Sequence, residues 1–328
     1  MDNNNPIDAV ITWVDGNDPD HIRKRNLYKK NTNKIESNNN TRFNQVNEIS
    51  IVVKSIFKFA PFVRNIYILT DLQTPDIINE TLQWDESYRS RLKLVDHKEV
   101  FRDHLEVLPS FNSSSIETMI QYINGLSDNF IYFNDDMFLI KPTKIEDWFE
   151  DGKPLVRGKW LSQPHRVWYK QIKKLLFPSK SKMWSFKKAQ ALSAAIEGYD
   201  KKYFRTFHTP RALNKIVLIN YFNQFPELLK KQIKPRFRLT DQFLSYTLIW
   251  HYSIKNKLAK TTNKIQLEEV NFKPKSSPNK VLRRVKKAVK SLDVLFLNLQ
   301  SLDLLEKNSL EKVIQILENI VHIDLTKK

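Results

Sequence analysis

With 328 residues, of which 41% are hydrophobic and 12% aromatic, the chain can fold around a substantial core and is not typical of a disordered protein. It contains no cysteine, which excludes disulfides, thiolate nucleophiles and zinc–thiolate sites, and its five glycines form neither a GxGxxG nor a GxxxxGK(S/T) phosphate-binding motif. The formal net charge of +18 indicates an anionic partner, but charge alone does not choose between nucleic acid, a membrane surface and a polyanionic substrate.

The first half of the chain predicts strands that alternate with helices. Residues 7–14 form a short β-rich run that ends in Asp15-Gly16, and residues 47–59 place apolar side chains at helical spacing before Pro61. The Asn-rich residues 31–41 are expected to form a loop. Alternation of this kind is typical of an α/β sheet. The expected strands are 7–14, 65–70, 92–95 and 130–133, and the expected helices are 47–59 and 113–123, the latter capped by Ser113 or Ser114.

The second half differs in composition and is expected to be mainly helical and basic. Residues 159–190 are rich in Lys and Arg and carry Trp160, Trp168 and Trp184, and residues 211–255 suggest helices broken near Pro226 and Pro235. A basic helix is expected within 273–290, and an amphipathic helix at 308–320. We expect one integrated catalytic domain with three parts: an α/β core (1–150), a helical region that completes the site (151–272) and a basic tail (273–328).

Carboxylates follow the predicted strands. Asp15 and Asp18 lie after the first strand, Asp71 after the second, and Asn134-Asp135-Asp136 after the fourth. The carboxyl ends of parallel strands meet at one edge of a sheet, where carboxylates can hold Mg²⁺ or Mn²⁺. Asp15 and Asp71 also fit ordinary turn or cap roles. The Asp135–Asp136 pair, flanked by apolar strands, needs a counter-ion.

A second candidate cluster surrounds His208. This histidine is followed by Arg211, and Arg236 and Arg238 lie further along the chain. Histidine suits proton abstraction from a hydroxyl near neutral pH, and paired arginines suit phosphate. The alternatives are a structural histidine and a solvated pair of arginines. Asp241 is expected to open a helix after this cluster.

The basic, Trp-bearing stretch 159–190 allows three interpretations. It fits an anionic membrane surface, a polyanionic glycan or a solvated face. Aromatic residues among lysines also suit nucleic acid, but no recognised nucleic-acid motif supports that, so no nucleic-acid partner is expected. The chain has no apolar run of 18 residues, and residues 1–6 lack the features of a secretory signal. These features fit a cytoplasmic protein. If the basic stretch meets a membrane, we expect peripheral contact with the inner face of the inner membrane.

Taken in order, these segments resemble the Stealth family, which contains capsular polysaccharide phosphotransferases and the lysosomal-enzyme N-acetylglucosamine-1-phosphotransferase. The opening IDAVITWVDGNDP resembles the first conserved region of the family, and Arg42-Phe43, Asn47-Glu48, residues 54–75 and 111–139 resemble the second. Residues 207–226 and 236–243 are similar to the third region, and FLNLQ (296–300) resembles the fourth more faintly. The chain departs from the pattern at Lys54, where Arg is usual, and at Leu72, where Gly is usual. In the fourth region it has Leu299-Gln300 in place of Asp, so a site carboxylate is missing there and no site residue is assigned.

The resemblance implies a GT-A-like, Rossmannoid mixed sheet flanked by helices, with a metal site at its edge. It also implies transfer of a sugar-1-phosphate, such as N-acetylhexosamine-1-phosphate, from a UDP-sugar donor to a hydroxyl of a capsular glycan acceptor, with release of UMP.

Site roles follow from this resemblance and from the clusters above. His208, Arg238, Asp15 and Arg42 are the expected catalytic residues, with His208 as the base. Asp135 and Asp136 are expected to hold Mg²⁺ or Mn²⁺. The expected substrate-binding residues are Asp18, Glu48, Asp71, Asn112, Glu117, Asn134, Arg211, Arg236 and Asp241.

Two other functions remain open from the sequence. A GT-A glycosyltransferase would use the same metal carboxylates but would break the sugar–phosphate bond and release UDP. A non-enzymatic polyanion-binding protein would depend on the net charge alone, and its binding would fall steeply with salt.

Overall fold

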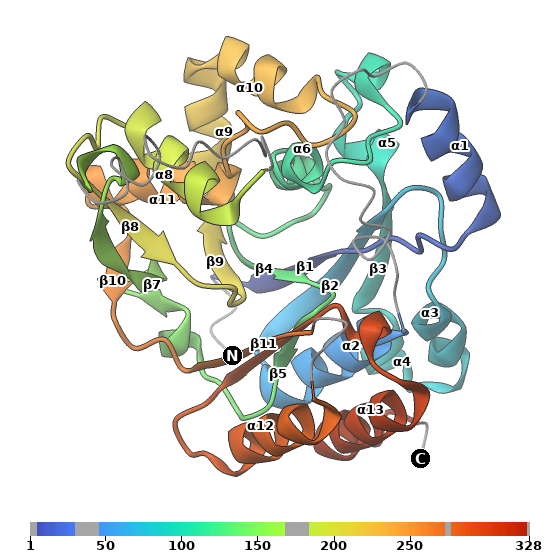
Figure 1. Cartoon of the computed structure of the whole chain (residues 1–328). Helices are drawn as coiled ribbons and strands as arrows, with labels where there is room; N and C mark the ends of the chain where they lie inside the picture. The colour runs from blue at the N-terminus through green and yellow to red at the C-terminus, as the bar shows by residue number, and fades with distance from the viewer. Residues whose placement is uncertain (1–4, 30–45, 168–183, 273–276, 327–328) are drawn as a thin grey trace.

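A mixed five-stranded sheet forms the centre of the protein. The computed structural model describes residues 5–29, 46–167, 184–272 and 277–326 (Figure 1). All four predicted strands are confirmed: they run parallel to one another, and a fifth strand, β9, pairs with β4 in the antiparallel direction. In spatial order the strands are β3 (Leu92–Asp96), β2 (Val63–Thr70), β1 (Ile7–Thr12), β4 (Asn129–Asn134) and β9 (Arg211–Asn214).

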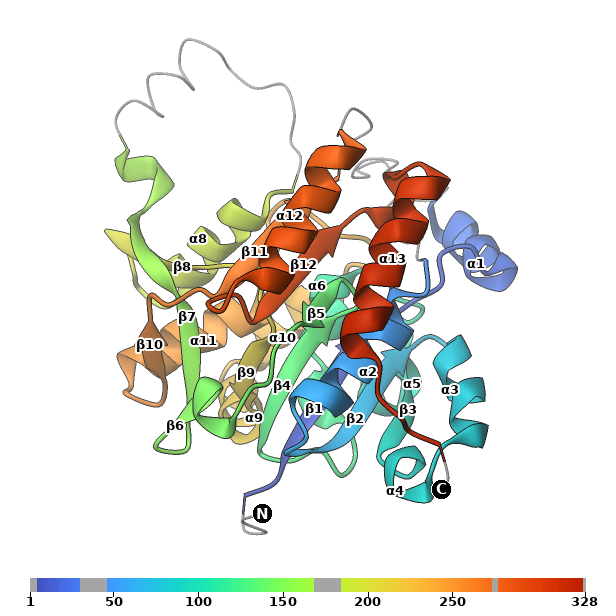
Figure 2. The ribbon, with the colours of Figure 1, turned by 90° about the horizontal axis from the view of Figure 1, so that it is seen from below.

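One face of this sheet is covered by α2 (Glu48–Phe59), against which the C-terminal helix α13 (Lys307–Val321) packs, and α12 (Pro278–Lys290) packs against α13. Figure 2 shows α12 and α13 side by side. The helix predicted at 47–59 is confirmed, because its apolar positions Ile49, Val52 and Ile56 are all buried. The basic helix within 273–290 and the amphipathic helix at 308–320 are confirmed as α12 and α13.

Helices from both halves of the chain cover the other face around a second apolar cluster. They are α5 (His97–Val100), α6 (Ser113–Glu117), α9 (Lys215–Gln224), α10 (Pro226–Ile233) and α11 (Ser245–Lys255). The remaining α-helices of the described residues are α1 (Pro19–Lys29), α3 (Asp76–Glu80), α4 (Glu86–Arg89) and α8 (Phe186–Ile196). Within the described ranges, none of the helices is both long and apolar enough to cross a membrane.

The second half is less helical than expected. It contributes β7 (Lys153–Ser162), which pairs with β6 (Phe149–Glu150), β8 (Lys202–Thr206) and β10 (Lys260–Thr262). A three-stranded sheet joins β11 (Leu267–Asn271), β12 (Phe296–Gln300) and β5 (Met137–Leu139). The prediction of helix from residue 211 was also wrong, because residues 211–214 form β9. Strands of this kind depend on distant pairing partners, which local periodicity does not reveal.

Two local predictions also need correction. The helix expected at 113–123 is shorter, since α6 ends at Glu117 and a 3-10 turn follows at Ile120–Tyr122. Its cap is Asn112 rather than Ser113 or Ser114, because the Asn112 side chain accepts a hydrogen bond from the Ser114 amide at 3.2 Å. Asp241 opens no helix, since it lies in a turn and α11 begins at Ser245.

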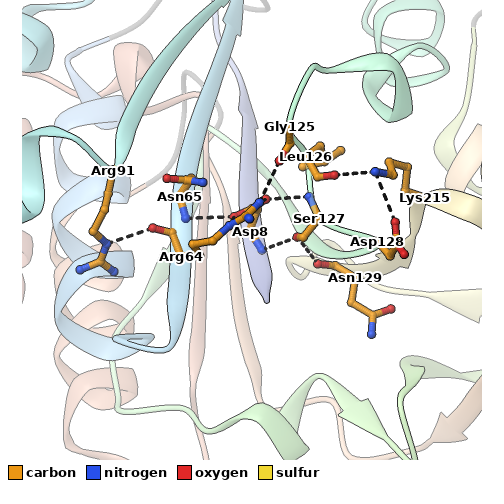
Figure 3. Close-up of polar contacts among 10 residues, drawn as sticks. All are labelled: Asp8, Arg64, Asn65, Arg91, Gly125, Leu126, Ser127, Asp128, Asn129 and Lys215. Atoms are coloured by element: carbon orange, nitrogen blue, oxygen red, sulfur yellow. Dashed lines mark hydrogen bonds and ion pairs between the residues drawn. The ribbon is translucent and has the colours of Figure 1, made fainter. Parts of the chain in front are cut away.

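A buried carboxylate ties the amino ends of the central strands together (Figure 3). Asp8 on β1 is fully buried and accepts hydrogen bonds from Arg64 Nε at 3.0 Å and Arg64 Nη2 at 2.6 Å. The backbone amides of Asn65 and Ser127 also donate to it, at 3.0 and 2.7 Å. The charge of Asp8 is therefore fully satisfied, at the end of the sheet away from the strand-end carboxylates.

Replacing Asp8 by alanine should lower the free energy of unfolding by about 3 kcal/mol, because Arg64 and two backbone amides lose their acceptor. Urea unfolding would measure this change. Asp128→Ala is the matched control, since the Asp128 side chain is 64% exposed and makes only a 3.3 Å ion pair with Lys215. We expect the control to lose less than about 1 kcal/mol. Equal unfolding midpoints for both variants would contradict a stabilising role for the Asp8 cluster.

Candidate active site

A cleft of about 700 Å³ opens at the carboxyl ends of the parallel strands. The ends of the strands and the residues that follow them reach it: Trp13 after β1, Asp71 after β2, His97 after β3, Asn134 at the end of β4, and Asp135 and Asp136 after it. The crevice outside these strand ends is where open α/β sheets bind their ligands. The predicted convergence is confirmed for Asp71, Asp135 and Asp136.

The second half of the chain also lines the cleft. These residues lie far from the strand-end carboxylates in sequence, so the cleft forms only when the two halves pack together. They are residues 184–187, 205–208, Arg211, Arg238, Leu244, Tyr246, Glu269, 299–301 and Asp303.

Five carboxylates gather on one side of the cleft, and we call them the acidic wall: Glu48, Asp135, Asp136, Glu269 and Asp303. Burial, reinforced by the charges of Asp136 and Asp303, raises the pKa of Glu48 to about 7. Burial raises the pKa of Asp136 to about 6, and burial together with Asp136 and Glu48 raises the pKa of Asp135 well above its usual range. Burial therefore disfavours the charged forms of these carboxylates, and a cation bound beside them would offset that cost.

The side chains of the acidic wall supply only some of the ligands that a divalent cation needs. In the described ranges, no three His, Asp or Glu side chains are grouped closely enough to hold a metal ion. However, Asp136 Oδ1 is buried and has no hydrogen-bond partner among the described residues. Mg²⁺ is commonly held by one or two carboxylates and completes its coordination with water and substrate phosphates. The Asp135–Asp136 pair fits a cation that is bound together with a phosphate.

A buried arginine lies beside the acidic wall. Arg211 is 1% exposed, and its Nη1 donates to Asn134 Oδ1 at 2.7 Å. Its guanidinium lies 4.2 Å from the ring centre of Tyr246 and 5.0 Å from that of Tyr132. These contacts fix the orientation of the guanidinium.

A second arginine, Arg238, also lines the cleft. Its guanidinium lies 4.1 Å from the ring centre of Trp184, and it donates to the Ser113 hydroxyl. Glu117 lies close enough to both arginines for their charges to oppose the rise that burial causes in its pKa. Two oriented guanidinium groups in the same cleft are suited to a phosphate.

His208 lies in the loop between β8 and β9. Its Nε2 is 3.8 Å from Asp136 Oδ2, and its side chain is 19% exposed. Burial and the positive charges of Arg211 and Arg238 lower the pKa of His208 to about 3. The imidazole is therefore neutral at neutral pH and has a lone pair available to accept a proton.

Five of the expected site residues do not line the cleft. Asp15 accepts from the Asn17 amide in a turn, and Asp18 accepts from the His21 amide at the start of α1. Asn112 is fully buried, where it caps α6 and donates to Pro235 O and Gln242 Oε1. Arg236 donates to the carbonyls of Glu106 and Leu108, and Asp241 is exposed. The other expected residues in the described ranges line the cleft: Glu48, Asp71, Glu117, Asn134, Asp135, Asp136, His208, Arg211 and Arg238.

Three predictions fall outside the described residues. They concern Arg42, Trp168 and the loop at 31–41.

Leu72, where Gly was usual in the pattern, has a φ of 55°, a conformation that favours glycine.

The sequence interpretation missed part of the cleft. Glu269 and Asp303 complete the acidic wall, and Tyr246 holds Arg211. Asn298, fully buried on β12, donates to the backbone oxygen of Asp136 at 3.0 Å. The faint fourth region, FLNLQ, was the available signal for β12, and a carboxylate does reach the cleft just beyond it, at Asp303.

Comparison with known proteins identifies two conserved regions. The family model described as Stealth protein CR1, conserved region 1, matches residues 5–32. The model described as Stealth protein CR2, conserved region 2, matches residues 42–156. An exopolysaccharide phosphotransferase of Streptomyces coelicolor is 32% identical over 247 residues, which is 75% of this chain and 39% of that protein. A capsular polysaccharide phosphotransferase of Haemophilus influenzae is 42% identical over 147 residues, and one of Streptococcus thermophilus is 39% identical over 150 residues. The matches cover 44% and 45% of this chain and only 38% and 59% of those two relatives.

Solved structures show more distant likeness. The galactosyltransferase LgtC in complex with donor and acceptor sugar analogs superimposes with a TM-score of 0.44 at 9% identity, covering 96% of this chain and 97% of that one. Mouse xyloside xylosyltransferase 1 superimposes with a TM-score of 0.41 at 9% identity, covering 89% and 97% of the two chains. With TM-scores below 0.5, these likenesses carry no argument about the cleft.

Proposed function

The chain belongs to the Stealth family of capsular and exopolysaccharide phosphotransferases, and from this membership we propose that it transfers a sugar-1-phosphate from a UDP-sugar to a hydroxyl of a glycan. N-acetylhexosamine-1-phosphate is the group we propose, with UMP as the leaving group and a phosphodiester-linked polysaccharide as the product.

One observation carries the proposal. A neutral histidine, the carboxylates of the acidic wall and two oriented arginines line a single cleft. Phosphoryl-type transfer needs a base for the hydroxyl, neutralised charge and in-line positioning, and it needs little else from the protein. His208 and Asp136, which are 72 positions apart in sequence, lie 3.8 Å apart in space, so the base and the proposed cation site serve the same reacting group.

The proposed reaction breaks the phosphoanhydride bond. The acceptor oxygen attacks the β-phosphorus, and the bond between that phosphorus and the oxygen of UMP breaks with its electron pair leaving on UMP. The hydroxyl proton passes to His208 Nε2. The bond between the sugar and its phosphate stays intact, so the sugar keeps its anomeric configuration. A divalent cation bound at Asp135 and Asp136 would neutralise charge on the leaving group.

The arginines position the transferring phosphate. Arg211 and Arg238 present fixed guanidinium groups, which suit the oxygens of a phosphate in a low-dielectric cleft. Burial, together with their positive charge, lowers the pKa of His208 to about 3, and a bound phosphate would offset the contribution of the charge. Substrate binding therefore strengthens His208 as a base at the moment when it is needed.

The nucleotide product tests the proposal. Purified protein is incubated with UDP-N-acetylglucosamine, Mg²⁺ and a capsule-type oligosaccharide, and UMP is separated from UDP. Acceptor-dependent UMP is the expected result. UDP would show glycosyl transfer in place of phosphotransfer. If a panel of UDP-sugars and acceptors released neither nucleotide, the proposal would fail in favour of a polyanion-binding protein.

A further inference from the structure

Two cations converge on one aromatic ring at the rim of the cleft. Lys159 on β7 and Arg205 on β8 lie opposite each other in the antiparallel register. The Arg205 guanidinium is 4.9 Å from the ring centre of Phe207, and Lys159 Nζ is 5.9 Å from it. Arg205 and Phe207 line the cleft, and Lys159 is exposed beside them, so we call this cationic pair the rim of the cleft.

The cationic pair lacks a counter-ion. Within the described part of the chain, neither Lys159 nor Arg205 forms an ion pair, and Arg205 Nε is buried without a hydrogen-bond partner. Like charges held this close repel each other, and an anion bound between them would relieve the repulsion. Phe207 offers each cation only the weaker attraction of an aromatic face. The chemistry of this rim therefore suits an oxyanion.

The position of the pair indicates which anion it binds. Phe207 directly precedes His208, and the segment from Arg205 to His208 spans at most about 10 Å. Arg211, Arg238 and the proposed cation site are sufficient to bind the donor phosphates. Lys159 and Arg205 are therefore not needed to bind the donor. An acceptor that reaches His208 with its hydroxyl passes this rim, and its own anionic group can meet Lys159 and Arg205.

We propose that Lys159 and Arg205 bind a phosphodiester already present in the acceptor chain, next to the sugar that carries the reacting hydroxyl. This inference rests on the proposed function and deepens it: the preferred acceptor is the enzyme's own product, so addition is repeated. A glycan fits better than a membrane surface, because Arg205 and Phe207 are partly buried in a cleft wall beside the base.

The test compares two acceptors of equal length. One is an N-acetylglucosamine oligosaccharide with a single phosphodiester linkage, and the other is its neutral, glycosidically linked counterpart. In the double variant Lys159→Gln, Arg205→Gln, the KM for the phosphodiester acceptor should rise roughly 10- to 100-fold, the loss expected for charge-assisted hydrogen bonds. The KM values for the neutral acceptor and the UDP-sugar should stay within about twofold. Lys202→Gln is the control, because Lys202 lies on the opposite face of β8, 4.9 Å from the ring centre of Trp160.

A binding measurement separates this inference from the proposed function. Calorimetric titration of the phosphodiester oligosaccharide without donor should give binding in the wild type and the control, and weakened binding in the double variant, whether or not any UDP-sugar turns over. If turnover occurs but the double variant treats both acceptors like the wild type, the inference fails and the function stands. An equal rise in KM for both acceptors, or a rise in donor KM, would also overturn it. So would reduced binding to vesicles of anionic lipid with an unchanged acceptor preference, which would assign the cations to a lipid headgroup.

Discussion

Replacing His208 by alanine should lower turnover by roughly 10²- to 10⁴-fold, the usual contribution of a positioned base. The variant loses the group that accepts the hydroxyl proton, while the acidic wall, Arg211 and Arg238 remain to bind the donor. Its affinity for the UDP-sugar should therefore change little. Rates of acceptor-dependent UMP release give the first quantity, and equilibrium titration with the UDP-sugar gives the second.

His322→Ala is the matched control for this variant. His322 is exposed and follows α13, away from the cleft residues, so its replacement should leave turnover unchanged. Turnover of His208→Ala within a few-fold of wild type would assign the base to another residue. A parallel loss of donor affinity and turnover would instead make His208 a binding residue.

Neutralising the carboxylate pair should have the second large effect. Asp135→Asn or Asp136→Asn should lower the Mg²⁺-dependent turnover by about a thousandfold or more. Charge neutralisation by a metal stabilises such a transition state by several kcal/mol. The stability of the fold, in contrast to the turnover, should not fall in these variants. Burial raises the pKa of both groups, and the charge of Asp136 adds to the rise in the pKa of Asp135, so their charged forms destabilise the fold at neutral pH. We expect an unchanged or higher unfolding midpoint in the metal-free variants.

Activity and stability together give this prediction its test. Turnover is measured across a Mg²⁺ titration, with EDTA-treated wild type as the reference, and unfolding is followed in urea. Asp293→Asn, an exposed carboxylate outside the cleft, should change neither quantity. Full Mg²⁺-dependent activity in both cleft variants would show that other residues hold the metal. A lower unfolding midpoint would show that the carboxylates are structural.

The candidate residues whose place in the cleft could be predicted from the sequence are those whose position follows from chain direction. Asp71, Asp135 and Asp136 come after strands whose apolar pattern was visible, so their meeting at one edge followed once the strands were parallel. Asn112 and Arg236 look equally polar in the sequence, yet the packing of residues 106–112 against residues 235–242 directs their side chains to backbone carbonyls. Burial of that kind depends on a neighbour more than 100 positions away.

By itself, the sequence determined the strands of the parallel sheet, helix α2, the absence of glycine-rich phosphate loops and thiolate chemistry, and the family to which the chain belongs. These properties follow from local periodicity, composition and ordered motifs. Only the tertiary structure decided that residues 211–214 form a strand, that Glu269 and Asp303 complete the acidic wall, and that Lys159 and Arg205 meet over Phe207. The physical reason is that each of these depends on pairing between segments remote in sequence, whose hydrogen bonds and burial leave no periodic signal in either segment alone.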